Sequence, residues 1–391
     1  MTLPLEGFRV LDLSAAFPGS LCSRILADLG AEVLKIEDPA GGDASRIRPP
    51  IVKRMGVFFH AINRNKKSVT LDVRNPRGQK ILHQLVERAD VFVENTRPGN
   101  LAKIGLGYED LVKINPRIVY CSISGFGQDG PYREFPIHDI NILALSGIMD
   151  LIGEKGRGPA VPDTQFGGAA GAMNAALGIL SALLRREKTG KGQYIDVSIL
   201  DGMIPYMTLS MCQFMHDGQL PRRGETLFGG GYAFWNVYRT KDGSYISLGC
   251  WEKKYWENFC RVVHREDLAK DQFSPPPRQD ELIGEVRAIF LEKTRAEWIK
   301  SLDPNLVCYA PVNSLEEALE DPQIQHRGLW FKESHPIDGQ VPQPGFSLKF
   351  SEDQPGWRTP APGIGEHTLG ILGELGIGKD ELQELKAAGI I

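Results

Sequence analysis

The sequence lacks long hydrophobic runs, closely paired cysteines and an excess of basic residues. Its first residues, Met-Thr-Leu-Pro-Leu-Glu-Gly, have neither the basic region nor the apolar core of a secretory signal. No run approaches the roughly 18 apolar residues that a membrane span needs. We therefore expect a cytoplasmic protein that is neither exported nor inserted in a membrane.

The cysteines and the charge exclude further classes of protein. Cysteine occurs at Cys22, Cys121, Cys212, Cys250, Cys260 and Cys308. This spacing contains no Cys-x-x-Cys pair and no histidine and cysteine ligand pattern, so we predict no metal site and interpret these residues as reduced core cysteines. A net charge of -4 offers no footprint for nucleic acid, although local basic clusters suit a phosphorylated small molecule.

The pattern that is present is an alternation of strands and helices. Strands are expected over 8–13, 31–36, 68–73, 90–94, 118–122 and 194–198, with helices over 19–29, 78–88, 108–114 and 171–186. Strands that alternate with helices predict an α/β domain with a doubly wound parallel sheet.

After residue 200 the pattern changes. A helix should begin near residue 200, a hairpin follows residue 229, and amphipathic helices such as 285–302 come next; a further helix opens after the Ser274-Pro-Pro-Pro277 break. Short strands are expected over 331–335 and 345–350, and a helix over 379–388. We predict a large domain over 1–200, linker helices over 201–228, a small domain over 229–325, and a C-terminal segment over 326–391 that returns to the large domain.

Six motifs carry a resemblance to a known family. They are Leu11-Asp-Leu-Ser, Asp28-Leu-Gly-Ala-Glu-Val-Leu-Lys-Ile-Glu37, Gly42-Asp-Ala-Ser-Arg46, Asn63-Arg-Asn-Lys-Lys-Ser-Val-Thr-Leu-Asp72, Ala89-Asp-Val-Phe-Val-Glu-Asn-Thr-Arg-Pro-Gly99 and Ser122-Ile-Ser-Gly-Phe-Gly127. Together they make nearly the whole chain resemble the class III CoA-transferases of the CaiB/BaiF type, which include formyl-CoA transferase and α-methylacyl-CoA racemase. The resemblance implies a Rossmann-like large domain built from both chain ends, a smaller α+β domain and an interlocked dimer.

The resemblance also implies a CoA site. The residues that would meet the nucleotide and phosphates are Arg46, Asn63, Arg64, Lys66, Leu71, Val73, Asn95, Arg97 and Lys103. Arginine and lysine suit the phosphates of CoA, whereas the alternative for any one of them is an ordinary solvated charge. Several of them flank predicted strands at the edge where α/β sheets bind ligands, which favours binding. No Gly-x-Gly-x-x-Gly follows the first strand, so the Rossmann-like domain does not imply NAD. The resemblance implies CoA or acyl-CoA as substrate, and we expect no covalently bound cofactor.

The expected catalytic position is a glycine. In the racemase branch a histidine acts with an aspartate thirty residues later, and His138 leads in this way to Gly168. The transferase branch has its nucleophilic aspartate at the same place, ten residues before Gly178. Glu252 matches a supporting glutamate of the small domain, with an ordinary surface carboxylate as the alternative, and His138 is either catalytic or structural.

Two loops bear on the same region. The segment Phe17-Pro-Gly-Ser20 departs from the family, where a small or polar residue is followed by Ala-Gly-Pro, and this loop approaches the thioester in relatives. The segment Gly229-Gly-Gly231 resembles a mobile loop over the acyl intermediate, with a simple hinge as the alternative.

Three hypotheses follow. The chain is a subunit of a CoA-transferase, acting on an acyl-CoA and a carboxylic acid acceptor, that relies on a homologous partner bearing the aspartate, as in the benzylsuccinate CoA-transferases. Alternatively it is an α-methylacyl-CoA racemase-like or transferase enzyme with a rearranged site using His138, Asp139, Asp163 or Glu252. The third hypothesis is a CoA-binding protein without a reaction. An engineered change of aspartate to glycine is also compatible with the sequence. The expected oligomer contains either two copies of this chain or this chain and its homologue, as a dimer or a heterotetramer.

Overall fold

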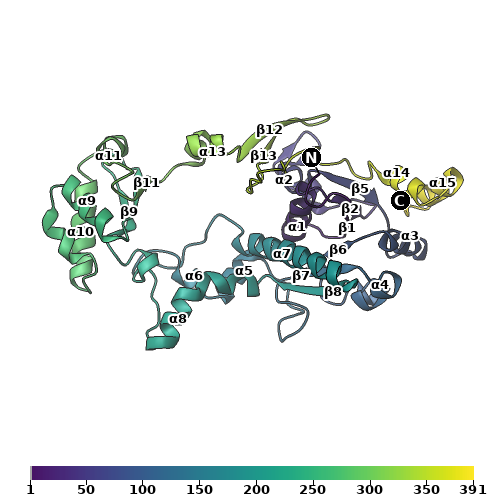
Figure 1. Ribbon diagram of the computed structural model, residues 1–391, viewed down its shortest axis with the longest axis horizontal. Helices are drawn as coiled ribbons and strands as arrows, with labels where there is room; N and C mark the ends of the chain where they lie inside the picture. The colour runs from purple at the N-terminus through teal and green to yellow at the C-terminus, as the bar shows by residue number, and fades with distance from the viewer. Residues whose placement is uncertain (1) are drawn as a thin grey trace. The chain divides into compact units, whose positions relative to one another are not determined.

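A parallel sheet of six strands organises the larger part of the chain (Figure 1). The computed structural model describes residues 2–391 and divides them into two units. Unit 1 contains the chain up to Leu143 together with Thr164–Ile204 and Pro322–Ile391, and unit 2 contains Ala144–Asp163 and Pro205–Asp321. The chain therefore leaves unit 1 twice and returns to it twice.

The sheet of unit 1 has the strand order β5-β2-β1-β6-β7-β8, and every neighbouring pair is parallel. The strands are β1 (Arg9–Asp12), β2 (Glu32–Glu37), β5 (Lys66–Thr70), β6 (Val91–Glu94), β7 (Val119–Ser124) and β8 (Gln193–Ser198). This order is the doubly wound Rossmann arrangement, in which the chain adds strands on one side of β1 and then on the other. The predicted α/β fold class is confirmed.

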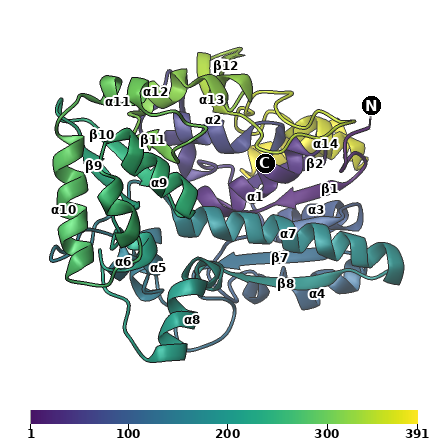
Figure 2. The same ribbon diagram turned by 60° about the vertical axis from the view of Figure 1, so that its left-hand side comes forward.

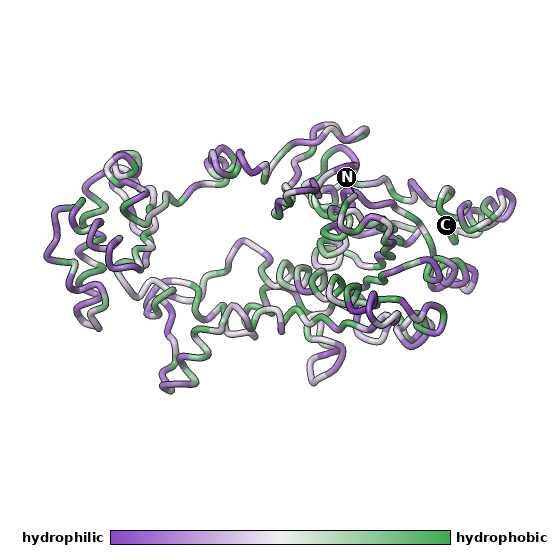
Figure 3. The backbone as a smooth tube through the Cα atoms, viewed as in Figure 1, coloured by the Kyte–Doolittle hydropathy of each residue, from purple (hydrophilic) through white to green (hydrophobic). Residues whose placement is uncertain are grey.

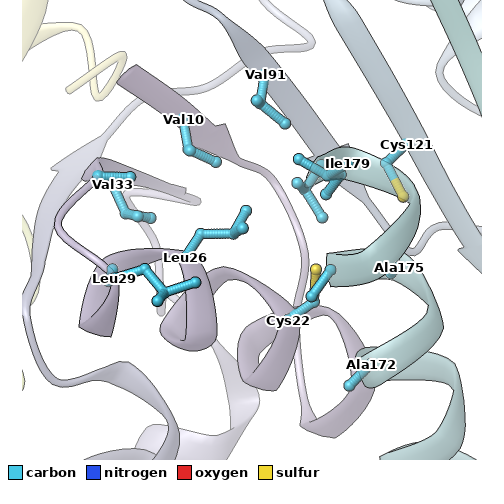
Figure 4. Packing of buried hydrophobic residues seen from close by; sticks show 14 of the residues in the cluster. Val10, Cys22, Leu26, Leu29, Val33, Val91, Cys121, Ala172, Ala175 and Ile179 are labelled. Atoms are coloured by element: carbon cyan, nitrogen blue, oxygen red, sulfur yellow. The ribbon is translucent and has the colours of Figure 1, made fainter. Parts of the chain in front are cut away.

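Alternate residues of each strand point to opposite faces of the sheet, and each face has its own core. On one face, Val10 and Val91 pack against α1 (Phe17–Asp28) and α7 (Phe166–Thr189). Figure 4 shows this core, with Leu26 of α1 and Ile179 of α7 beneath the strands. The close approach of α7 depends on alanines such as Ala172 and Ala175, which are completely buried.

The other face is covered by α3 (Pro76–Glu87), α4 (Tyr108–Ile114), α14 (Thr368–Glu374) and α15 (Lys379–Ala387). The last two helices come from the C-terminal end of the chain. The backbone N–H of His367 donates to the Ser68 carbonyl oxygen, and that of Thr70 donates to the Thr368 hydroxyl. The return of the C-terminal segment to the first part of the chain agrees with the prediction.

Helix α7 is long and apolar enough, by length and composition, to cross a membrane. The sequence analysis missed this property, because small residues and interspersed polar ones break its hydrophobic run. Figure 2 shows α7 running along β7 and β8, and hydrophobic residues recur along it in Figure 3. Its inner side forms part of the core of unit 1.

The remaining elements of unit 1 are short. They are η1 (Ala44–Ile47), β3 (Ile51–Val52), β4 (Met55–Gly56), α2 (Val57–Asn63), η2 (Ala102–Ile104), α13 (Pro322–His326), β12 (Trp330–His335) and β13 (Gly339–Pro344). Helix α5 (Asp139–Leu145) and the 3₁₀ helix η3 (Asp201–Met207) begin in unit 1 and end in unit 2.

The strand predicted over 345–350 is wrong. The partner of β12 is β13, which ends at Pro344, and the turn over 336–338 joins the two strands, so that His335 pairs with Gly339. β13 contains prolines at 342 and 344, which are tolerated because this ladder has two strands and proline is compatible with a sheet edge.

Unit 2 is built on a three-stranded antiparallel sheet of order β11-β10-β9. Its elements are α6 (Ile148–Leu151), α8 (Thr208–Asp217), η4 (Leu227–Gly229), β9 (Trp235–Arg239), β10 (Tyr245–Gly249), α9 (Lys253–Val262), η5 (Glu266–Asp271), α10 (Arg278–Phe290), α11 (Arg295–Ser301), β11 (Tyr309–Pro311) and α12 (Leu315–Glu320). Its core contains Trp256, Phe259, Phe290 and Trp298. The predicted hairpin is confirmed as β9 and β10, and the stretch 285–302 is divided between α10 and α11.

Two expectations differ from the structure in detail. The segment 144–163, predicted within the large domain, and residues 205–228, predicted as linker helices, both group with unit 2. Four cysteines are buried as predicted, but Cys212 and Cys308 are exposed, because the apolar residues around them do not cover them.

Candidate active site and nucleotide pocket

The carboxyl ends of β1 and β6 form the point where the strand order reverses, which is the usual ligand site of doubly wound sheets. Asn95, directly after β6, accepts a hydrogen bond from the Ala15 N–H at 2.8 Å and donates to the Ala15 carbonyl oxygen at 2.6 Å. One amide therefore ties the two loops together at this point. Some of the residues predicted to bind a ligand line a cavity near this point, and others make internal contacts.

A cavity of about 400 Å³ opens beside this point, within the usual size range of small-molecule pockets. Among the predicted contact residues, Leu71, Val73 and Lys103 line it, and Asn95 and Arg97 flank its lining residue Thr96. Lys103 and Arg97 are exposed, so their charges are available to an anion. The other lining residues are Leu13, Ile36, Glu37, Asp38, Asp72, Arg74, Asn100, Leu101 and Ile104.

Lys66 makes several internal contacts. Its buried ammonium is 3.0 Å from the carboxylate of Asp12 and also donates to Asn63 Oδ1 and Ser23 Oγ, each at 2.8 Å. The Ser20 carbonyl oxygen accepts a further hydrogen bond at 3.0 Å. The ammonium is thus occupied by internal acceptors, and Asn63 is occupied by Lys66.

Two of the three predicted arginines, Arg46 and Arg64, are buried in internal ion pairs as well. Arg46 makes a bidentate contact with Glu37, at 2.8 and 2.6 Å, and Arg64 makes one with Asp28, at 3.0 and 2.7 Å. Both guanidinium groups also donate to backbone carbonyl oxygens of the C-terminal segment. Arginine was expected at a phosphate because of its planar fork, and here carboxylates of the same subunit use that fork. The side chains of Arg46, Asn63, Arg64 and Lys66 therefore support the sheet edge from within.

Electrostatics explain why this buried network remains ionised. Burial opposes the ionisation of Asp12, but Lys66, Lys35 and two serine hydroxyls outweigh it and lower its pKa to about 2. Burial lowers the pKa of Lys66 to about 8 against the opposing effect of Asp12. The second buried lysine, Lys35, lies 2.9 Å from Asp43. The sequence signal for this network is Lys35, a lysine inside the otherwise apolar run of β2, and the sequence analysis did not predict the network from it.

Gly168 is the third residue of α7 and is buried. Its backbone N–H donates to the Asp139 carboxylate at 2.7 Å, so Asp139 caps the start of this helix. His138 precedes Asp139 in the chain and is exposed. The structure therefore brings the predicted histidine segment and the predicted catalytic position together, with no side chain at position 168 to accept or donate a proton.

The other predicted site residues lie in unit 2. Glu252 is exposed at the N-cap of α9, where its side chain makes no cap hydrogen bond. Gly230 adopts a φ of 90°, a conformation that glycine allows, in a turn that joins η4 to β9. A cavity of about 1130 Å³ in unit 2 is lined by Phe228, Trp235 and the Gly229 and Gly230 backbone. The supporting role of Glu252 and the mobility of the 229–231 loop therefore remain predictions.

One buried group has the residue types of a metal site. His60, His335 and Asp338 lie together although His60 and Asp338 are 278 positions apart, so spacing could not reveal them. The Nδ1 of His335 accepts hydrogen bonds from the N–H groups of Ile337 and Asp338, and its Nε2 lies 3.2 Å from the Ala361 carbonyl oxygen. Both nitrogens of His335 are therefore engaged with the backbone, and the group ties the hairpin β12-β13 to α2.

Comparisons with known proteins point in one direction. Residues 5–368 match CoA-transferase family III. The chain is 34% identical to succinyl-CoA:glutarate CoA-transferase of Mus musculus, over 99% of this chain and 90% of the relative. It is also 34% identical to α-methylacyl-CoA racemase of Homo sapiens, over 100% and 98%. A crystal structure of a CAIB/BAIF family protein from Brucella suis superposes with a TM-score of 0.84 at 31% identity, covering 96% of this chain and all of that one.

Proposed function

The chain belongs to CoA-transferase family III, and from this premise we propose that it is a CoA-binding transferase subunit that lacks its own catalytic carboxylate. It binds acyl-CoA and works with a homologous, aspartate-bearing subunit that transfers CoA to a carboxylic acid acceptor. The observation that carries this proposal is the combination of an open nucleotide pocket and a glycine at position 168. The pocket for the nucleotide is present, whereas the position expected to carry the nucleophile has no side chain.

The CoA nucleotide is assigned to the pocket at the carboxyl ends of the strands. Leu71 and Val73 provide its apolar wall, and Lys103 and Arg97 provide exposed cations for phosphate. The four buried residues Arg46, Asn63, Arg64 and Lys66 act by fixing the strand ends rather than by touching the phosphates. This narrows the proposed CoA contacts to Leu71, Val73, Asn95, Arg97 and Lys103.

The missing carboxylate matters because the transfer needs a nucleophile. A side-chain carboxylate attacks the acyl-CoA thioester, expels the CoA thiolate and is left as a mixed anhydride. The thiolate attacks the protein-side carbonyl of this anhydride, which releases the donor carboxylate and leaves a side-chain CoA thioester. The acceptor carboxylate attacks that thioester and expels the thiolate, and the thiolate attacks the acceptor's carbonyl in the new anhydride, which gives the new acyl-CoA and frees the side-chain carboxylate. Gly168 cannot take part in any of these steps. The carboxylate of Asp139 is 2.7 Å from the Gly168 N–H but serves as the cap of α7.

A second subunit also has a surface to meet. The outer side of α7 exposes Phe166, Met173, Leu177 and Leu184 by 40%, 58%, 64% and 70%. Their spacing of seven, four and seven residues places them on one stripe of the helix. Soluble monomers rarely leave such contiguous apolar surface open, so we assign this stripe to the partner subunit.

The test begins with the native mass and subunit composition of the protein isolated from its own source. A complex with a similar-sized homologue bearing the aspartate is expected. The recombinant chain alone should bind CoA by calorimetry but transfer no CoA between acyl-CoA and carboxylates, and the homologue should restore transfer. Lys103→Ala should weaken CoA binding, whereas Lys80→Ala, on the exposed side of α3, should not. Transfer at ordinary enzymatic rates by the chain alone would contradict the proposal.

A racemase-like activity is the second candidate, favoured by the exposed His138 beside the capped start of α7 and by the racemase relative. In that case His138 moves the α-proton of a 2-methylacyl-CoA. Deuterium from the solvent would then enter the α-carbon, and His138→Gln would abolish this exchange. CoA binding without exchange, transfer or a homologous partner would instead support the third hypothesis, a CoA-binding protein without a reaction.

A further inference from the structure

Position 168 is closed by a single side chain. A Cβ atom added to Gly168 would lie 2.7 Å from Cδ1 and 3.3 Å from Cε1 of Phe17, far inside ordinary contact distance. The next neighbour, Gln165 Oε1, lies at 3.6 Å, which is normal contact. The backbone of Gly168 is helical, so its conformation does not itself require glycine. The phenyl ring alone stands where a side chain at position 168 would begin.

The neighbouring glycines of α7 are constrained differently. A Cβ on Gly167 would lie 2.9 Å from the Asp139 carboxylate and 3.1 Å from Ile199, and one on Gly171 would lie 2.9 Å from Ile199. Those neighbours cap the helix and pack its inner side, so they belong to the framework of unit 1. Glycine is therefore required by the framework at 167 and 171, and by one aromatic ring at 168.

The position of that ring is itself held. Phe17 is the first residue of α1, and its ring lies 5.5 Å from that of Phe58, tilted by 36°. The preceding residue, Ala16, has φ 57° and ψ -148°, a strained conformation for a residue with a Cβ. The two hydrogen bonds between Asn95 and Ala15 fix the loop just before it. The backbone that carries Phe17 is therefore constrained, and its half-buried ring has the Phe58 ring as a neighbour.

We infer that Phe17 is the residue that excludes a side chain from position 168, and that glycine at 168 is matched to it. In the proposed function, on which the following consequence rests, position 168 is the catalytic position. The ring of Phe17 then occupies the space that the side chain of a catalytic aspartate would need. Restoring a carboxylate at 168 then takes two substitutions, one to bring in the acid and one to remove the ring. Phe17 thus determines whether this subunit can host the reacting group.

A double-mutant cycle in thermal unfolding tests the steric part without any activity. Gly168→Ala should lower the unfolding temperature of the wild type, because the ring must move by about 0.7 Å to reach ordinary contact. In the Phe17→Ala background the same substitution should raise the unfolding temperature, since alanine is favoured over glycine in a helix. Phe17→Leu, which also removes the ring, is the second background if Phe17→Ala does not fold.

Gly370→Ala is the matched control. Gly370 is also the third residue of its helix, α14, is exposed, and has nothing within 4 Å of an added Cβ. It should shift the unfolding temperature equally in both backgrounds. Equal shifts for Gly168→Ala in both backgrounds would overturn the inference, because the two positions would then be independent.

A second readout separates this inference from the proposed function. Gly168→Asp with Phe17→Ala should form a covalent acyl or CoA adduct with acyl-CoA, detected by intact mass, whereas Gly168→Asp alone should form much less. Equal adduct in both proteins counts against the role of Phe17. If the thermal coupling is present but neither protein forms an adduct, the inference about Phe17 stands and the assignment of position 168 as the catalytic position fails.

Discussion

Replacing Lys66 with methionine should destabilise the protein without weakening the CoA affinity of its folded form. The substitution keeps the length of the side chain and removes the ammonium. It leaves the Asp12 carboxylate completely buried with one cation fewer, and it also removes a donor from Asn63 and from Ser23. The same residue was expected to bind phosphate, so the result separates a structural role from a binding role.

The expected loss is large because the remaining partner cannot reach water. Removing one member of a buried ion pair costs about 3–5 kcal/mol in the free energy of unfolding. Lys35 also lowers the pKa of Asp12 and so reduces this loss. Its ammonium, however, already forms an ion pair with Asp43 at 2.9 Å. Against a typical stability of about 5–15 kcal/mol, the change is easily measured.

Urea unfolding gives the free energy of unfolding. Isothermal titration calorimetry on the folded protein, without denaturant, gives the CoA affinity. We expect a lower urea midpoint with an unchanged slope for Lys66→Met. Lys103→Ala provides the contrast, since its exposed ammonium lines the pocket, and it should weaken CoA binding while shifting stability by less than about 0.5 kcal/mol. A Lys66→Met protein of normal stability with strongly reduced CoA affinity would refute the reasoning.

Three further predictions follow from the same region. Because the folded-state pKa of Asp12 is lowered to about 2, its contribution to stability is complete above the ordinary value of 3.8 and is lost as the pH falls through about 2; acid unfolding monitored by circular dichroism should show this, and constant stability from pH 4 to 2 would contradict it. Gly78→Ala should cost about 1–3 kcal/mol or more in urea unfolding, because the added Cβ would lie 2.0 Å from the Asp72 carbonyl oxygen, and a neutral effect would show that this turn is adaptable. Asn95→Ala removes both hydrogen bonds to Ala15 and should cost about 1–3 kcal/mol, again by urea unfolding, whereas an unchanged midpoint would mean that the loop is held by other contacts.

The parallel sheet was predictable from local sequence, because buried parallel strands are short apolar runs separated by amphipathic helices. β6 and β7 lie close to the predicted positions for this reason. The strand predicted over 331–335 agrees with β12, but the one predicted over 345–350 was misplaced, because its actual counterpart β13 contains prolines that are compatible with a two-stranded ladder but not with a central strand. Local patterns indicate a strand, but they do not say how many neighbours it will have.

The residues predicted to bind CoA show a similar division. Leu71, Val73 and Lys103 were predicted, and the structure places them around one pocket because they follow or flank parallel strands. Arg64 and Lys66 were predicted with equal reason, yet their charges point inward to carboxylates. The residue type is the same in both groups, and only the direction of the side chain differs.

The sequence by itself determined the family, the α/β class and the glycine at position 168, because each depends on residue identity and on order along the chain. The tertiary structure decided which cations are free to meet a phosphate, and that Phe17 occupies the space beside Gly168. Phe17 and Gly168 are far apart in sequence and meet only because α1 and α7 pack on the same face of the sheet. Burial and contact of this kind arise from the packing of distant segments, which no local pattern contains.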